Sequence, residues 1–446
     1  MAKTPTSVVI RGYQVGFGDC FLVSFVYSET DTRHVLIDFG TTGLPMRGTP
    51  RAAAKPSEHM PRVAEQIKKD CGGRLTAVVA THRHADHISG FATDNRTGQS
   101  GLTIRDLKPK VVLQPWTEDP AAARDARKAT RNSSRSRKSF VAGLRAMNDI
   151  AQAILGLAES RPAWMGPALQ KELQFLGMDN IANKSAVENL IAMGAAKGAT
   201  AVWAHHGSRS GLASHLPGVK VRVLGPPSLQ QTEKIRRMRA SDPDQFWHLL
   251  AGPPSLQAAA PLAKGLDRRR SARAPGVPPE ARWFLDKLQR LRGEHLLQIV
   301  RTLDDQMNNT SLILLFEVFG KKLLFPGDAQ LENWSYALQD APDATKTSGL
   351  LAAVDVYKVG HHGSLNATPK KLLWEEFAKR NKSGAGRLQT LLSTMPGKHG
   401  KVANKSEVPR KTLLEALKTE SRLSNTNELK FGKDPQLRYE VVVKPD

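Results

Sequence analysis

The segment VVATHRHADHISG, residues 78–90, places three histidines and one aspartate within six positions directly after an apolar run. Histidine and aspartate are poor residues for a strand or a core, so a fold that keeps them there must hold them for a reason. In an extended chain alternate residues point the same way, so His82 and His84 can reach one point together. A helix that opens directly after them would turn Asp86 and His87 towards a neighbouring point.

These residue types predict a metal centre. Neutral imidazole and carboxylate are the ligands of zinc, manganese and iron, and two neighbouring points suggest one or two divalent ions. We take zinc as the first choice and manganese or iron as alternatives. A pair of ions about 3.5–4 Å apart would need a bridging ligand from a later strand. A lone histidine would favour a polar surface loop, whereas four residues of ligand type in this order after a buried strand favour metal.

Alternating strand and helix patterns predict the α/β class, with layered sheets. Helical spacing marks residues 59–73 and 408–418, and an apolar pair around Phe319-Gly320-Lys321 predicts a hairpin. Strand patterns occupy residues 7–16, 19–28, 34–40, 75–82, 108–116, 198–208, 218–227, 308–330, 354–364, 388–400 and 437–445.

The chain is expected to form one domain over residues 1–446, interrupted by two insertions. The core is expected at roughly 5–115, 199–226 and 300–446. The segments at roughly 116–198 and 227–299 are basic, lack strand alternation, and are predicted to be largely helical insertions. The segments AHHGS, residues 204–208, and GHHGS, residues 360–364, are similar to each other, and each follows an apolar strand pattern.

The charge of the chain predicts an anionic partner. There are 65 basic against 42 acidic residues, a formal net charge of +23. Such an excess attracts nucleic acid first and other anionic substrates second, although a solvated basic face would give the same count. Aromatic residues make up only 6%, so no stacking platform for single strands is visible. The predicted nucleic-acid contacts lie in the insertions and are Arg131, Arg135, Arg137, Lys138, Arg268, Arg269 and Arg270.

The two cysteines and the start of the chain bear on location. Cys20 and Cys71 lie far apart without CxxC spacing, which argues against a disulfide framework and against a cysteine-based zinc site. Residues 1–13 lack the apolar core of a signal peptide, and no run approaches transmembrane length. We therefore expect a cytoplasmic protein with no membrane partner; the sequence says nothing about protein partners.

The pattern His82-x-His84-x-Asp86-His87 resembles the signature of the metallo-β-lactamase superfamily. The resemblance implies a four-layer αββα sandwich with a one- or two-metal site at one edge. The segments YQVGFGDCFLVSF, MNNTSLILLFEVFGKKLLFPGDA and DVYKVGHHGS further resemble the hydrolase domain attached to bacterial DNA-uptake (competence) channel proteins and its stand-alone relatives. The similarity spans roughly residues 8–115 and 300–395 and does not include the channel itself.

The resemblance also implies roles for single residues. Asp38, at the end of VLIDFG, matches the aspartate that supports the metal-binding loop without being a ligand. Asp328, in LLFPGDAQ, matches the bridging aspartate, and KVGHHGS matches the late histidine ligand. We expect His361 to bind metal, and His362 to act in catalysis with Asp86, while the reverse order of the two histidines stays open.

One element of the superfamily pattern has no clear counterpart. A third histidine usually completes the first metal site, between the signature and the bridging aspartate. His205 and His206, at a strand end, are the best-placed candidates, ahead of His215, His248 and His295. If neither binds, the first ion would be weakly held and a one-metal site becomes an alternative.

Three hypotheses follow for function. The first is a metal-dependent phosphodiesterase or nuclease in which the ion lowers the pKa of bound water to about 7. The second is a hydrolase of a small phosphoester, lactone or cyclic nucleotide, because the fold serves many substrates. The third is a binding or regulatory module with a residual metal site, against which the near-complete ligand set argues. Lys358, Ser364 and Asn366 are candidate neighbours of the pocket, although residues of these types are more often structural. His399 follows a strand pattern and is either a further neighbour at the same edge or a solvated loop histidine.

Overall fold

A computed structural model describes most of the predicted core. The described residues are 3–45, 55–119, 183–228, 230–232, 308–364, 366–400, 407–431 and 435–446. Most of both expected insertions therefore lies outside the described residues, including every arginine and lysine predicted to contact nucleic acid.

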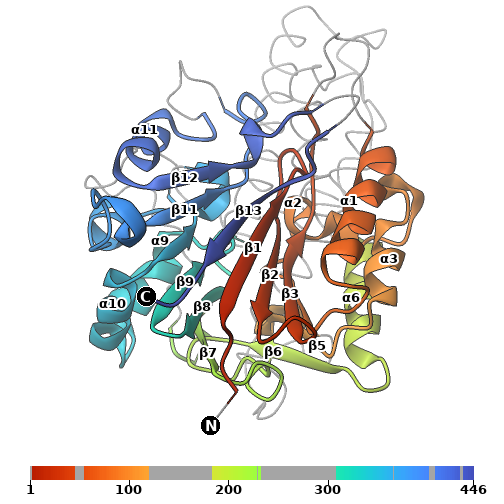
Figure 1. The fold of residues 1–446 in the computed structure, drawn as a ribbon, viewed down its shortest axis with the longest axis horizontal. Helices are drawn as coiled ribbons and strands as arrows, with labels where there is room; N and C mark the ends of the chain where they lie inside the picture. The colour runs from red at the N-terminus through yellow and green to blue at the C-terminus, as the bar shows by residue number, and fades with distance from the viewer. Residues whose placement is uncertain are drawn as a thin grey trace, which may run out of the picture.

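One mixed sheet is built mainly from the first half of the chain (Figure 1). Neighbouring strands are antiparallel from β13 (Arg438–Val443) to β3 (Thr32–Phe39) and parallel from β3 to β6 (Thr200–Ala204). The C-terminal strand thus lies beside the N-terminal one. In spatial order the strands of this sheet among the described residues are β13 (Arg438–Val443), β1 (Ser7–Tyr13), β2 (Cys20–Val26), β3 (Thr32–Phe39), β4 (Ala77–Val79), β5 (Val111–Pro115) and β6 (Thr200–Ala204).

A second mixed sheet comes from the later part of the chain. Its parallel half runs from β12 to β9, and its antiparallel half includes the predicted hairpin, which is confirmed, with its turn at Phe319 and Gly320. In spatial order its described strands are β12 (Arg422–Asn425), β11 (Gln389–Leu392), β10 (Val356–Lys358), β9 (Lys321–Phe325), β8 (Ile313–Val318) and β7 (Val219–Gly225).

The strands of both sheets are apolar on both sides, and the two sheets pack face to face through one apolar side of each. On β2, Phe21, Val23 and Phe25 point between the sheets, while the alternate residues point to the opposite face. Phe316 on β8 does the same from the other sheet, and its ring centroid lies 5.8 Å from that of Phe25. Burial on both faces requires a further layer outside each sheet.

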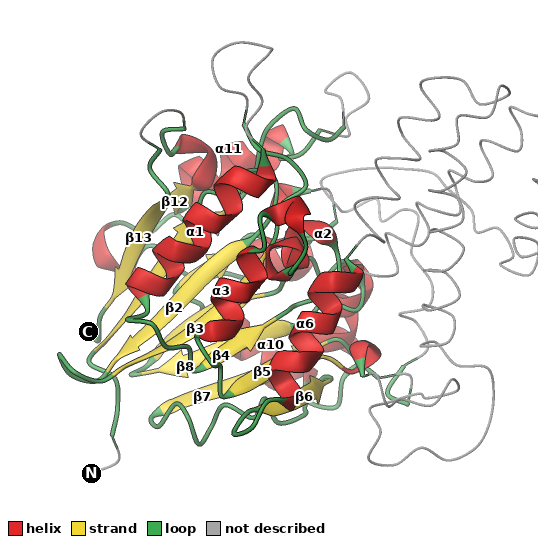
Figure 2. Ribbon diagram, turned by 90° about the vertical axis from the view of Figure 1, so that its right-hand side faces the viewer, coloured by secondary structure: helices red, strands yellow, loops and turns green. Residues whose placement is uncertain are grey.

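Helices supply these outer layers. On α1, Met60, Val63, Ala64 and Ile67 follow helical spacing and pack against the outer face of the first sheet. Figure 2 shows α1, α3 and α6 side by side over that face. The α-helices of the described chain are α1 (Pro56–Asp70), α2 (Ala85–Ile88), α3 (Ser100–Asp106), α6 (Lys184–Ala195), α9 (Leu331–Ser335), α10 (Ala344–Ala352) and α11 (Lys411–Glu420).

The second sheet is covered in the same way. Leu351 of α10 and Leu413 and Leu417 of α11 pack on its outer face together with Trp334 of α9. The chain is therefore α/β with two mixed sheets between helical layers, in agreement with the predicted class. Within the described residues, no helix has the length and apolar character needed to cross a membrane.

Helix α6 belongs to the core although the sequence assigned its residues to the first insertion. Ala186, Leu190 and Met193 are buried against the outer face of the first sheet. The alanine-rich, mildly amphipathic pattern of this helix continues from the basic tract before it, so composition alone does not separate the two.

Backbone contact fixes where α2 lies. Gly40 follows β3, and a Cβ atom placed on it would come within 2.4–2.5 Å of backbone atoms of Ala85, Asp86 and His87. The amide of Gly40 also donates to the carbonyl of Asp19 at 3.0 Å, and the amide of Asp19 donates to the carbonyl of Asp86 at 2.8 Å. The loop after β1 and the end of β3 thus clamp the helix that carries the signature.

We expect Gly40→Ala to lower the free energy of unfolding by about 1–3 kcal/mol or more, because α2 must shift to admit the methyl group. Gly349→Ala is the matched control. This glycine is exposed on α10 with nothing within 4 Å of its Cβ position, so alanine should raise stability by about 0.5–1 kcal/mol. Urea unfolding of both variants checks this; equal stability of the two would contradict the clamp.

Candidate metal centre

The signature histidines leave β4 in an extended segment and end at a short helix, as the sequence predicted. His84 has φ −62° and ψ 151° and caps α2, on which Asp86 and His87 lie in the first turn. Because the segment is extended, His82 and His84 fall on the same side, with ring centroids 4.6 Å apart. The helical turn then presents Asp86 and His87 next to them.

Two adjacent groups of ligand atoms result. His82, His84 and Asp86 form the first group, and Asp86, His87, Asp328 and His362 form the second, each group having one ligand atom per residue within 4.8 Å of the others. Five of the six side chains are buried, and that of Asp86 is 12% exposed. Asp86 belongs to both groups. The sequence had predicted Asp328 as the shared ligand, whereas here Asp328 joins only the second group.

The orientation of His87 is set by Asp38, the residue that the resemblance implies as a support of the metal-binding loop. Nδ1 of His87 lies 2.8 Å from Oδ2 of Asp38, whose two oxygens also accept the amide and the hydroxyl of Thr81 at 2.7 and 2.8 Å. With Nδ1–H donated to Asp38, a neutral His87 ring turns the lone pair of Nε2 into the cluster. Nε2 there faces Oδ2 of Asp328 at 2.9 Å.

His362 has the same arrangement from the other sheet. Its Nδ1 lies 3.0 Å from the backbone carbonyl oxygen of Ser393, which can only accept, so Nδ1 carries a proton. Its Nε2 faces Oδ2 of Asp86 at 3.0 Å. For a neutral ring, a nitrogen lone pair would then meet a carboxylate oxygen. The contact of His362 with Asp86 and that of His87 with Asp328 are favourable only when a proton or a cation lies between the nitrogen and the oxygen.

The donor set fits a divalent cation by a further observation. Nε2 of His82 is buried without a hydrogen-bond partner, and buried polar atoms of this kind are rare in folded proteins. Imidazole nitrogen and carboxylate oxygen together suit zinc, manganese and iron. We conclude that the described residues can hold a metal ion, with no preference among these three metals.

The backbone at the second histidine pair is strained. His361 and His362 follow β10 in the short segment Gly360–Gly363 and have φ values of +44° and +52°. This left-handed conformation is costly for residues other than glycine and concentrates at functional sites. It turns the two neighbouring side chains in different directions, so that His362 is buried and His361 keeps 22% of its side chain exposed.

This geometry favours exchanging the roles expected for the two histidines. His362 joins the second ligand group, while Nε2 of His361 lies 3.9 Å from Oδ2 of Asp328 and outside both groups. The main-chain amide of His361 nevertheless donates to Oδ1 of Asp328 at 3.0 Å. Sequence could not decide between adjacent histidines, because the choice depends on their backbone torsions.

The structure brings neither candidate for the third histidine to the ligand groups. His206 has both ring nitrogens engaged elsewhere, Nδ1 with the carbonyl of Leu224 at 2.8 Å and Nε2 with Asp343 at 2.9 Å. Nδ1 of His205 contacts the carbonyl of His206 at 2.9 Å. The first group therefore has three protein ligands among the described residues, and the histidine pair after β6 serves the packing of that loop.

Two charged residues extend the site, and one of them escaped the sequence analysis. Asp19, in GFGDC, is 1% exposed and forms an ion pair with Lys358, which is itself only 2% exposed. Asp19 also forms a third buried group with Asp38 and His87. Its position at the start of a strand pattern gave no signal beyond an acid in an apolar context.

Charges within the cluster shift each other's pKa. Burial alone would lower the pKa of His87, but the carboxylates of Asp328 and Asp38 outweigh it and raise that pKa well above its ordinary value. Burial would raise the pKa of Asp328, but His87, His362 and Lys358 hold it well below its usual range. Ionised carboxylates thus demand positive charge here. A metal ion would displace protons from the imidazoles, so its affinity should fall as pH falls.

The remaining expected neighbours lie at different distances from the cluster. Phe17 separates His362 from His399, with ring centroids 4.4 and 4.2 Å away, so His399 does face this edge. Burial lowers the pKa of His399 to about 3. Ser364 is buried beside His361, to whose carbonyl its amide donates, whereas Asn366 belongs to neither ligand group.

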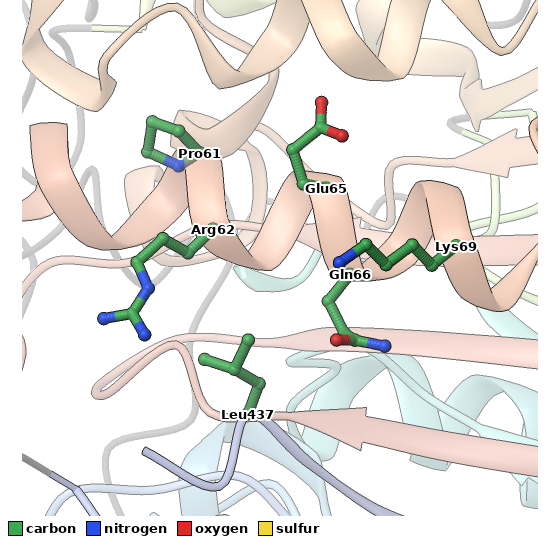
Figure 3. Close-up of a pocket in the computed structure, with 6 residues that line it drawn as sticks. All are labelled: Pro61, Arg62, Glu65, Gln66, Lys69 and Leu437. Carbon is green, nitrogen blue, oxygen red and sulfur yellow. The ribbon is translucent and has the colours of Figure 1, made fainter. Parts of the chain in front are cut away.

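A hollow on the surface lies away from this centre. It is lined by α1 and by the segment before β13, and none of its residues belongs to the ligand groups (Figure 3). Its lining consists of Pro61, Arg62, Glu65, Gln66, Lys69 and Leu437.

Comparison of the sequence with protein-family models and with curated proteins finds no match. The candidate centre therefore rests on its own geometry.

We expect His362→Ala to lower the bound metal per chain markedly, because it removes a buried ligand nitrogen, whereas His361→Ala should leave the metal content near that of the wild type. Elemental analysis after dialysis against Zn²⁺ and gel filtration measures both. If His361→Ala loses metal and His362→Ala does not, His361 is the metal ligand, as expected from the sequence.

Proposed function

We propose that this chain is a metal-dependent hydrolase of the metallo-β-lactamase superfamily that uses one or two divalent ions. The observation that carries the proposal is the carboxylate of Asp86, which belongs to two adjacent groups of buried imidazole and carboxylate ligands. Adjacent ion sites that share a ligand are typical of enzymes that hydrolyse phosphate esters and amides.

The architecture supports the proposal. Two sheets lie face to face between helical layers, and the ligand residues follow strands of both sheets. Their order along the chain, with Asp38 first, the signature next, then Asp328 and a late histidine, is the order that the sequence resemblance implies. Two features of the described residues depart from that pattern: no third histidine joins the first group, and Asp86, not Asp328, belongs to both groups.

A divalent cation bound by these residues would supply a Lewis acid and lower the pKa of water to about 7. The protein's part is to hold the ligands: Asp38 fixes the ring of His87, and the Ser393 carbonyl fixes the ring of His362. Three protein ligands, as in the group of His82, His84 and Asp86, are the number usual in catalytic zinc sites.

His361 is the candidate for moving a proton. Its imidazole is partly exposed and lies beside Asp328, so Nε2 can reach a substrate at the rim and protonate a leaving group. His399, by contrast, is neutral at pH 7 because burial lowers its pKa to about 3. It therefore suits a hydrogen bond with substrate better than proton donation.

The net charge of +23 favours a phosphodiester in nucleic acid as the substrate. A small phosphoester, lactone or cyclic nucleotide is the alternative, because the described site alone contains nothing that requires a polymer. A purely regulatory role fits less well, since the ligand atoms are buried and their rings are fixed by second partners.

We expect hydrolysis of a phosphodiester, tested on a nitrophenyl diester and on DNA and RNA, to require Mn²⁺ or Zn²⁺ and to stop on chelation. His82→Ala and Asp328→Ala should lower kcat/KM by more than about 100-fold, because each removes a ligand. His205→Ala is the matched control and should keep activity. Undiminished, chelator-resistant turnover by Asp328→Ala would refute the metal mechanism.

Salt dependence separates the two substrate classes. If about six phosphates are contacted, affinity for DNA should fall about 10³-fold between 50 and 200 mM salt. Replacing Arg268, Arg269 and Arg270 by alanine should flatten the slope by about one unit per lost contact. Binding measured in EDTA by fluorescence anisotropy checks this. A salt-independent affinity, with turnover of small diesters only, would favour the small-molecule alternative.

A further inference from the structure

We propose that Lys358 is a positioning residue that divides the two oxygens of Asp328, holding one away from the metal centre and leaving the other for an ion. This inference rests on the proposed function, since it concerns the same centre. It assigns to a buried lysine, and to its partner Asp19, a role beyond packing.

The place of Lys358 is unusual for a lysine. It ends β10, three residues before His361, and is 2% exposed. Lysine side chains are almost never fully buried unless they are paired. Here Nζ donates to the carbonyl of Gly327 at 3.1 Å, lies 3.4 Å from Oδ1 of Asp328, and forms an ion pair with Oδ2 of Asp19.

Asp328 is held from two sides with different atoms. Oδ1 faces Nζ of Lys358 and accepts the amide of His361 at 3.0 Å. Oδ2 faces the imidazole nitrogens of His87 at 2.9 Å and of His362 at 3.6 Å. One oxygen is thus occupied by protein donors, and the other points into the ligand group. Such outer contacts orient ligands in metal proteins.

Asp19 completes the arrangement from the other sheet. It precedes β2, and its main chain is hydrogen-bonded to Asp86 on the signature helix and to Gly40, which packs against that helix. With Asp38 and His87 it forms the third buried group of possible ligands. Because the Lys358 ammonium pairs with Asp19, that group already has its cation inside the protein. We therefore expect metal at the two groups around Asp86 and none at the third.

If the ion pair of Lys358 and Asp19 were purely structural, the expected effect of replacing its residues would differ. Replacing both partners of a buried pair by neutral residues is often tolerated, whereas removing one partner leaves a buried charge and destabilises the fold. If the pair only stabilises the fold, the double replacement should restore stability and metal binding together. If Lys358 also positions Asp328, the double replacement should restore stability alone.

The experiment compares the full chain with Lys358→Met, Asp19→Asn and the double variant. Urea unfolding gives stability, competition with a chromophoric chelator gives Co²⁺ affinity, and the visible spectrum of bound Co²⁺ reports its coordination. We expect Lys358→Met to be destabilised and to bind Co²⁺ about 10–100-fold more weakly than wild type. We expect the double variant to regain stability but to keep the weakened affinity and an altered spectrum.

Lys379→Met is the matched control, because Lys379 forms an ion pair with Asp355 away from the ligand groups and should bind Co²⁺ like the wild type. Wild-type affinity and spectrum in the folded double variant would overturn the inference, as would tighter binding by Lys358→Met. A double variant that fails to fold also counts against it, since the charges would then serve folding. A wild type that binds neither Co²⁺ nor Zn²⁺ would instead refute the proposed function, and this inference with it.

Discussion

The rest of this structure depends on one constraint: carboxylates that are buried beside imidazoles, where the two sheets meet, must be paired with positive charge. A buried charge is costly unless it is paired, and each acid here has a partner drawn from a distant part of the chain. Asp38 pairs with His87, and Asp19 pairs with Lys358 across the two sheets. Asp86 faces Nε2 of His362, and Asp328 faces Nε2 of His87. In neutral rings these nitrogens carry lone pairs. Positive charge must therefore be present in the cluster, and a divalent ion can supply it.

Rigidity at the centre comes from the strand ends and carries a cost in backbone strain. Asp38, His361 and His362 have φ values of +57°, +44° and +52°, and each such residue costs about 1–3 kcal/mol. The apolar seam between the sheets and the two outer helical layers hold these torsions in place. The main chain of Asp19 and Gly40 adds a direct clamp on α2. A site of this kind is built before any ligand arrives, which is the condition for fixed electrostatics.

Much of the fold could be predicted because its strands carry strong local patterns. The β-branched and aromatic runs at β1, β2 and β3 and the hairpin of β8 and β9 are where the sequence placed them. Other elements have weak local signals. The strand β12 has the sequence RLSN, which is short and polar, and α10 contains threonine, serine and glycine, so only packing on the second sheet makes them regular.

The sequence by itself determined the ligand types of the centre. His82, His84, Asp86 and His87 reach neighbouring points because an extended segment followed by a helical turn permits little else. Tertiary structure alone decided which later residues join them. Torsions after β10 select His362 over its neighbour, loop packing withdraws His206, and the meeting of the two sheets pairs Asp19 with Lys358. The contact of His206 with Asp343 spans 137 positions and that of His362 with Asp86 spans 276, so no local pattern encodes these choices.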